Sequence, residues 1–188
     1  VSLTTGGSAS ATAAPALADY TLGLTITIPA GSLSASVTLL AVNDDPLDEE
    51  DEQVVIDMAC DATCSEATAQ QQSVTIVDNT DLPTVTLSTG AGSIREKTTP
   101  TSTQVTALLS AVSAKVVTIT LTTSGTATST IDYTLAGTIT VPAGIQSASV
   151  TLKAVDDTPL DEENETVIID MDCDAACNEA TPQQQTVN

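Results

Sequence analysis

The stretch Ala41–Cys64, AVNDDPLDEEDEQVVIDMACDATC, joins an acidic loop directly to an apolar segment and a pair of cysteines. Its positions 44–52 hold seven Asp or Glu residues and no Lys or Arg. The residues that follow are rich in Val and Ile, whose branched side chains fit a pleated sheet better than a helix. The stretch therefore predicts a strand that begins beside a dense patch of negative charge.

The same arrangement returns 113 residues later (154 − 41), as AVDDTPLDEENETVIIDMDCDAAC from Ala154. Residues 19–74 align with residues 132–187 without a gap, and 40 of the 56 aligned positions are identical. A repeat of this length is too long for a solenoid unit and suits one β-sandwich domain. We therefore expect two tandem domains, and the shared register shows that the acidic residues hold fixed places.

Strand patterns fill the rest of each unit, and no segment shows a helical period. Val, Ile and Leu alternate with Thr and Ser, as in strands that bury one face, and clusters of Gly, Pro, Ser and Asp separate these segments as turns. Tyr20 and Tyr133 are the only aromatic residues, and we expect them to pack in the core. The expected strands of the second unit are 83–88, 104–110, 115–123, 137–144, 147–155, 165–171 and 183–187. The sequence thus predicts an all-β fold.

The two units begin and end at different points of the repeat. Val1–Thr5 matches Ile119–Thr123, so the unit at 1–81 lacks counterparts of the first two strands of the unit at 82–188. The second unit in turn lacks the end of its last strand. Both would expose sheet edges, which proteins usually protect. Two explanations stay open: the chain is a window on a longer array, or neighbouring copies of the chain supply the missing strands.

The charge of the chain limits its partners. Its formal net charge is −21, from 25 acidic residues against four Lys or Arg. Such a polyanion repels nucleic acids and anionic membrane surfaces, so we expect no nucleic-acid partner. No stretch is long and apolar enough to span a bilayer and no signal peptide is visible. We therefore expect no direct membrane insertion.

Several features in a fixed order give each unit a resemblance to the Calx-beta domain family. Asp-Tyr comes first, then a strand ending in Pro-x-Gly, a strand running into Asp-Asp, and Glu-x-x-Glu before the next strand. The match covers almost all of residues 83–188 and most of residues 1–81. The resemblance implies an immunoglobulin-like sandwich of about seven strands per unit, whose acidic loops gather at one end and bind Ca²⁺. The family occurs in regulatory loops of sodium–calcium exchangers and in long extracellular adhesion proteins.

The resemblance also implies a set of metal ligands in each unit. Those of the first unit are Asp19, Asp44, Asp45, Glu49, Glu52 and Asp78, with the backbone carbonyl of Leu47. Those of the second unit are Glu96, Asp132, Asp156, Asp157, Glu162 and Glu165. The chain departs from the family pattern at Thr158, which replaces the counterpart of Asp45, and at Asp48 and Asp161, where the family is usually apolar. We expect one or two ions per unit.

The chemistry of these residues points to the same ion. Carboxylates that lie close together resist ionisation unless a cation lies between them. Ca²⁺ takes 6–8 oxygen ligands in flexible geometry, whereas Mg²⁺ requires a stricter octahedron. A site built only from oxygen also favours Ca²⁺ over zinc or copper. The alternative is that the acidic stretch is a solvated loop that binds nothing.

The four cysteines form two C-x₃-C pairs, Cys60 with Cys64 and Cys173 with Cys177. Each pair lies between two predicted strands, so we expect a disulfide within each loop and an oxidising compartment. A metal site of four cysteines, disulfides between molecules and free thiols in a cytosolic protein remain the alternatives.

The sequence predicts a binding or structural protein and not an enzyme. Without His, a Ser or Cys nucleophile lacks its usual base. We expect a Ca²⁺-binding structural or adhesive repeat segment of an extracellular or cell-surface protein. Its partners would be neighbouring repeats or copies of the same chain, in an array or in a filament formed by strand exchange. The alternative is an intracellular Ca²⁺-sensing pair of regulatory domains.

Overall fold

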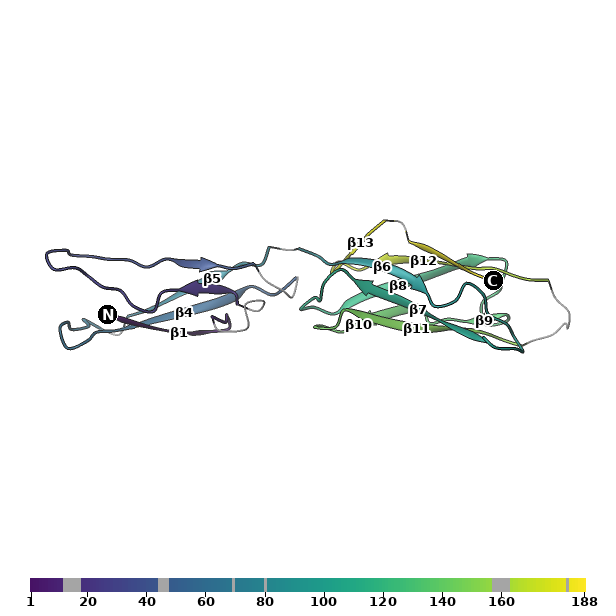
Figure 1. Cartoon of the computed structure of the whole chain (residues 1–188), viewed down its shortest axis with the longest axis horizontal. Coiled ribbons are helices and arrows are strands. Elements are labelled where there is room, and N and C mark those ends of the chain that lie inside the picture. The colour runs from purple at the N-terminus through teal and green to yellow at the C-terminus, as the bar shows by residue number, and fades with distance from the viewer. Residues whose placement is uncertain (12–17, 44–47, 69, 80, 157–162, 182) are drawn as a thin grey trace. The chain divides into compact units, whose positions relative to one another are not determined.

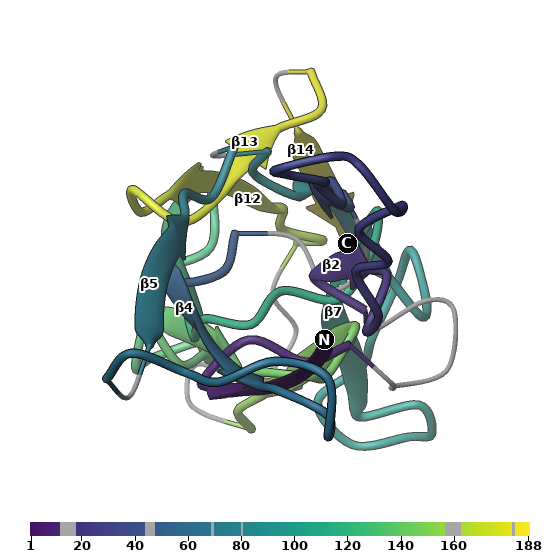
Figure 2. The same cartoon turned by 90° about the vertical axis from the view of Figure 1, so that its left-hand side faces the viewer.

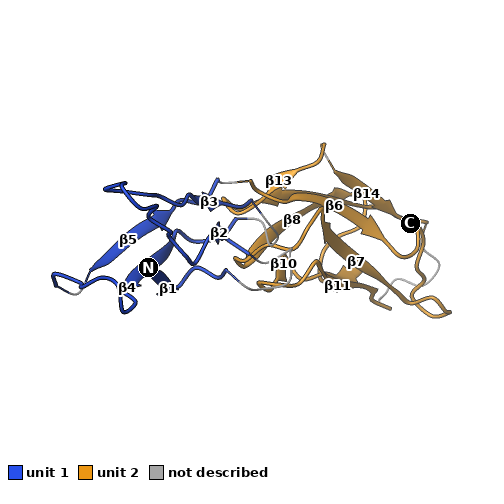
Figure 3. Ribbon diagram, turned by 60° about the vertical axis from the view of Figure 1, so that its left-hand side comes forward, with its two compact units in different colours: residues 1–80 blue, residues 81–188 orange. Residues whose placement is uncertain are grey.

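The computed structural model describes residues 1–11, 18–43, 48–68, 70–79, 81–156, 163–181 and 183–188 of the chain. All the regular secondary structure within these residues is β-strand, which confirms the predicted all-β fold. The described residues contain no helix with the length and hydropathy to cross a membrane. The chain divides into two compact units, Val1–Thr80 and Asp81–Asn188 (Figure 3).

The second unit consists of two facing sheets (Figure 1). The first sheet has the order β10 (Thr138–Val141), β8 (Val117–Gly125), β12 (Val167–Cys173), β14 (Gln184–Val187). The second has the order β13 (Asn178–Glu179), β6 (Thr84–Thr89), β7 (Ser102–Leu109), β11 (Ser147–Ala154), β9 (Tyr133–Thr134). All neighbours are antiparallel except β13 and β6, which are parallel. The arrangement is that of a β-sandwich.

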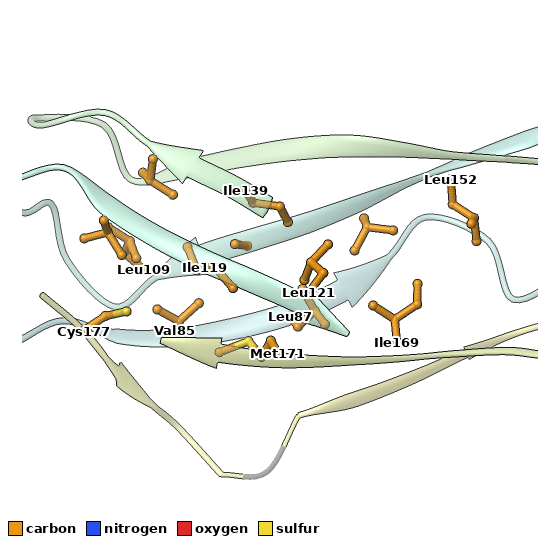
Figure 4. Close-up of a cluster of buried hydrophobic side chains, with 14 of the residues drawn as sticks. Val85, Leu87, Leu109, Ile119, Leu121, Ile139, Leu152, Ile169, Met171 and Cys177 are labelled. Carbon is orange, nitrogen blue, oxygen red and sulfur yellow. The ribbon is translucent and has the colours of Figure 1, made fainter. Parts of the chain in front are cut away.

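Aliphatic side chains from alternate positions fill the space between these sheets (Figure 4). In β6, Val85 and Leu87 are buried, while Thr86 and Ser88, which alternate with them, are exposed. The same alternation recurs in β7, β8 and β12. Tyr133 is also buried in this core. The period-2 pattern of the sequence therefore selects which face of each strand packs inward.

All seven strands expected in the second unit are present, together with two short ones that the sequence did not predict. These are β9 and β13, each two residues long. Two residues cannot display an alternation, so no pattern marks them. β13 follows the disulfide loop and pairs with the edge of β6, and β9 pairs with the end of β11.

The first unit holds a smaller version of this fold. Its strands are β1 (Ser2–Gly7), β2 (Tyr20–Leu22), β3 (Leu39–Ala41), β4 (Glu52–Ala59) and β5 (Gln71–Ile76). One sheet has the order β1-β4-β5, with β4 running beside β5 (Figure 2), and β2 pairs with β3. By the repeat, β1, β4 and β5 are the counterparts of β8, β12 and β14, and β2 and β3 are those of β9 and β11. No described residue of the unit forms a counterpart of β6 or β7. Tyr20 is buried, as expected, with Val54.

A glycine ends the strand that leads to each acidic Asp-Tyr loop. Gly7 of β1 has φ +107° and Gly125 of β8 has φ +115°. An added Cβ would lie 2.0 Å from the carbonyl oxygen of Gln53 or 2.2 Å from that of Thr166. Only glycine fits this close approach between strands, because it has no Cβ and accepts a positive φ. Both units therefore leave the sheet at the same point and in the same way.

Both predicted disulfides are formed, and none of the four cysteines is free. The Cα atoms of Cys60 and Cys64 are 5.4 Å apart, and those of Cys173 and Cys177 are 5.6 Å apart. A four-cysteine metal site and free thiols are thereby excluded for this structure. Disulfides of this kind are typical of proteins in oxidising compartments.

Candidate metal centre

Four predicted ligands of the first unit line one pocket. The pocket has a volume of about 230 Å³ and lies where β3 ends and β4 begins. Its acidic lining residues are Asp19, Glu49, Glu50, Glu52 and Asp78. They come from three separate places in the chain, so the fold and not the sequence alone brings them together. Glu50 joins the predicted set.

Asp19 is held in place by the backbone around it. It is 8% exposed. Its carboxylate oxygen Oδ2 accepts a hydrogen bond from the backbone N–H of Ser10, and its own N–H donates to the Ser10 carbonyl at 3.0 Å. The Asp19 carbonyl in turn accepts from the N–H of Val42 at 2.8 Å. Asp19 therefore fastens the loop that precedes β2 to the end of β3.

Two further contacts connect the segment after β5 to the acidic loops. The N–H of Asp78 donates to Oδ1 of Asp51 at 3.1 Å, and the side-chain amide of Asn79 donates to Oδ1 of Asn43 at 2.8 Å. Glu52, the first residue of β4, is paired with Ile76 in the β-ladder, and its Oε2 is shielded from solvent. The sequence did not single out Asp51 or Asn79, because nothing in the pattern distinguishes these tethers from the neighbouring acids.

The second unit has a pocket at the corresponding place. Its volume is about 330 Å³, and it is lined by the predicted ligands Glu96, Asp132 and Glu165. Glu163 lines it as well, as Glu50 does at the equivalent position of the first unit. The equivalent residues Asp19 and Asp132 thus lie at equivalent pockets, although the loops before them differ in length by five residues.

Asp132 repeats the hydrogen bonds of Asp19. Its Oδ2 accepts from the N–H of Thr128, which corresponds to Ser10, and its N–H donates to the Thr128 carbonyl at 3.0 Å. The Asp132 carbonyl accepts from the N–H of Val155 at 2.9 Å. One oxygen of each aspartate is thus used in fixing its loop. This structural role alone would explain why both units carry the residue.

The second pocket differs from the first in its basic residues. Arg95 and Lys97 line it, and Nζ of Lys97 lies 3.0 Å from Oδ1 of Asp156, a predicted ligand that is not part of the lining. Both side chains of this ion pair are about half exposed. The first unit has no Lys or Arg anywhere in residues 1–80. The second pocket therefore carries its own positive charge, whereas the first does not.

Five predicted ligands lie outside the residues that the structure describes: Asp44, Asp45, Leu47, Asp157 and Glu162. Within the described residues, no group of three or more Asp, Glu, Cys or His side chains is arranged to hold a metal ion. The described acids line a shared pocket in each unit without forming a complete ligand shell.

The donor set suits one kind of ion. Every side-chain donor at the first pocket is a carboxylate or an amide, and hard cations such as Ca²⁺ and Mg²⁺ bind oxygen ligands of this type. The lining offers no cysteine or histidine, the ligands that favour zinc and copper. Carboxylates on loops from several parts of a fold can supply the variable geometry that Ca²⁺ accepts.

Comparison with known proteins adds no assignment. No protein-family model matches the chain, and a search of curated proteins finds no similar sequence.

Proposed function

We propose that the chain is a Ca²⁺-binding structural or adhesive repeat segment of an extracellular or cell-surface protein, with Calx-beta-like units. The observation that carries the proposal is the gathering of Asp19, Glu49, Glu52 and Asp78 around one pocket in a unit with no Lys or Arg. In the first unit these carboxylates would hold the ion. In the second unit Asp132, Glu165 and Glu96 would do so.

The role of the ion would be to neutralise charge and stabilise the fold. An ion that binds only the folded state stabilises it by mass action, by about 2.7 kcal/mol at one hundred times the dissociation constant. The chain requires some such compensation, because its net charge of −21 favours expansion. The two disulfides support an oxidising location and disfavour the alternative of an intracellular sensor. Neighbouring repeats or further copies of the chain would be its partners, in an array or filament.

Thermal unfolding of the oxidised protein in chelator and over a Ca²⁺ series tests this function, with Mg²⁺ as the competing ion. We expect a saturable rise of the melting temperature that is selective for Ca²⁺. The substitution Glu52→Gln or Glu165→Gln should remove that rise from one unit only, because each removes one charge from one pocket.

Asp172→Asn is the matched control. Asp172 is an exposed acid of β12 that does not line the pocket, and its substitution removes the same charge. Its Ca²⁺ response should equal that of the unaltered protein. An identical melt in chelator and in saturating Ca²⁺ would show that the acidic stretches are solvated loops. A response lowered equally by all three substitutions would point to general screening of charge.

A further inference from the structure

The same six residues form one continuous strand in the second unit, whereas in the first unit only the last of them, Leu39, lies in a strand. The sequence SASVTL occurs at 34–39 and at 147–152, but only the second copy lies in a strand along its whole length, β11. There it pairs with β7, from Ser147 opposite Leu108 to Lys153 opposite Ser102. No counterpart of β7 is present among the described residues of the first unit. The difference therefore comes from a missing neighbour and not from the sequence.

Apolar side chains around this position are buried in the second unit and exposed in the first. Val74 is 41% exposed, while its equivalent Val187 is 1% exposed. Ile28 is 47% exposed, while its equivalent Val141 is 0% exposed. In the second unit the strands β6 and β7 supply Val85, Leu87, Val105, Ala107 and Leu109 to the core that covers these positions. The first unit therefore presents the face that β6 and β7 cover in the second.

Glutamines at the edge of β14 recognise the backbone of β6. The N–H of Leu87 donates to Oε1 of Gln183 at 3.3 Å, and Nε2 of Gln185 donates to the carbonyl of Leu87 at 3.2 Å. The first unit has the same glutamines, Gln70 and Gln72, and both are exposed. Nothing in the sequence identified this role, because a run of three glutamines also suits a plain exposed strand.

We propose that the first unit binds an antiparallel strand pair of the β6–β7 type, supplied by a neighbouring repeat. Its inward residues would pack on Ile28 and Val74, and its second strand would pair with residues 34–39. One residue of its first strand would donate its N–H to Gln70 and accept a hydrogen bond from Gln72 at its carbonyl, as Leu87 does with Gln183 and Gln185. This docking rests on the repeat function proposed above and identifies the surface and the partner through which neighbouring repeats would associate. The docking does not require Ca²⁺. The partner is defined by its pattern: Val or Leu inward at alternate positions, and Thr or Ser outward.

Exchange of β6 and β7 between two copies of this chain does not satisfy the surface. Moving these strands from one copy's second unit would expose the residues that they now cover, Ile119 and Ile169 among them. For each first unit that the exchange covers, it would uncover one second unit, so the number of uncovered sheet faces would be unchanged. The partner is therefore a strand pair additional to the one that the chain already uses.

The repeat supplies an exact design for the test. Because Val1 aligns with Ile119, a second copy of residues 81–118 can be joined directly in front of Val1 without a linker. Hydrogen exchange is then measured on the extended and the original chain, both in chelator. We expect the backbone amides of residues 34–39 and of β5 to exchange at least about tenfold more slowly in the extended chain, because apolar area is buried and a ladder of hydrogen bonds forms. Exchange in the second unit should stay the same.

Two matched controls separate specific docking from added mass. Leu87→Asp together with Val105→Asp, made only in the added copy, should abolish the protection. In the extended chain, Gln72→Ala should reduce the protection, whereas Gln71→Ala should not. The corresponding Gln184 is exposed, whereas Gln185 is partly buried and donates to the Leu87 carbonyl.

Unchanged exchange at 34–39 in the extended chain would overturn the proposal. So would the same protection from the added copy that carries the two Asp substitutions. Protection of this segment in the original chain that rises with protein concentration would also overturn it, because a second copy would then be the occupant. All three results are read in chelator, so they stand apart from any failure of the Ca²⁺ function.

Discussion

Replacing one valine by alanine at equivalent positions of the two units tests whether the face of the first unit is open in solution. Val74→Ala and Val187→Ala remove the same two methyl groups from the same place in the repeat. Val187 is 1% exposed and is paired with Val167, and the neighbouring Asn188 is fixed by two backbone hydrogen bonds of 2.8 and 3.0 Å to the segment after β6. Val74 is 41% exposed.

The burial of each side chain sets the expected cost. At about 0.8 kcal/mol for each buried methylene, the transfer cost at Val187 is about 1.6 kcal/mol, and the cavity raises it to roughly 2–3 kcal/mol. At Val74, about three-fifths of that transfer cost applies and solvent fills the space, so about 1 kcal/mol is expected.

Native-state hydrogen exchange measures both changes in the full chain, because the amides of β4 and of β12 report the opening free energy of their own units. Each variant should lower protection only in the unit that carries it. Equal losses at the two positions would refute the reasoning, since they would mean that Val74 is covered in solution.

Three further predictions concern single contacts of the structure. Lys97→Ala should change the stability of the second unit by less than about 1 kcal/mol, since the ion pair of Lys97 with Asp156 is half exposed. The same substitution should tighten Ca²⁺ binding to the second pocket, because it removes a positive charge there. Weaker Ca²⁺ binding, measured by calorimetry, would contradict this prediction. Gln185→Ala should lower protection of β6 by about 1 kcal/mol, the usual worth of one hydrogen bond. Hydrogen bonds from the side chain and then the backbone of Thr63 lower the pKa of Asp61 below its usual 3.8, so the stability that this carboxylate adds is present above pH 3.8 and is lost as the pH falls through the lowered pKa. An NMR titration of the Asp61 carboxyl carbon checks this direction, and Thr63→Val should move its midpoint back toward 3.8.

Much of the fold follows from the alternation of apolar and hydroxyl residues. The strands β6, β7 and β8 lie where the sequence predicts them, because each is long enough to show which face is buried. The disulfide pairing is also as expected, because each C-x₃-C pair is local. The site was predictable in part: Asp19 and Glu52, far apart in the chain, do line one pocket.

What the sequence did not predict depends on neighbours in space. Residues 34–38 carry a strand pattern but lie outside any strand, because the pattern describes a side chain's preference and not the presence of a pairing partner. The role of Gln185 depends on the proximity of Leu87, which is 98 residues away in the chain. The Lys97–Asp156 ion pair is likewise a product of the fold, since nothing in the spacing of the two residues connects them.

The two lengths of the loop before the Asp-Tyr pair have a consequence for how such a chain can change. In the first unit nine positions separate Ser10 from Asp19, and in the second four separate Thr128 from Asp132, yet the same hydrogen bonds close both loops. The cost of closing a loop grows only slowly with its length. Insertion of foreign sequence after Ser10 should therefore leave the aspartate and its pocket undisturbed. The chain already contains both versions of that experiment, so this loop is the natural place to graft a binding epitope or a reporter onto the scaffold.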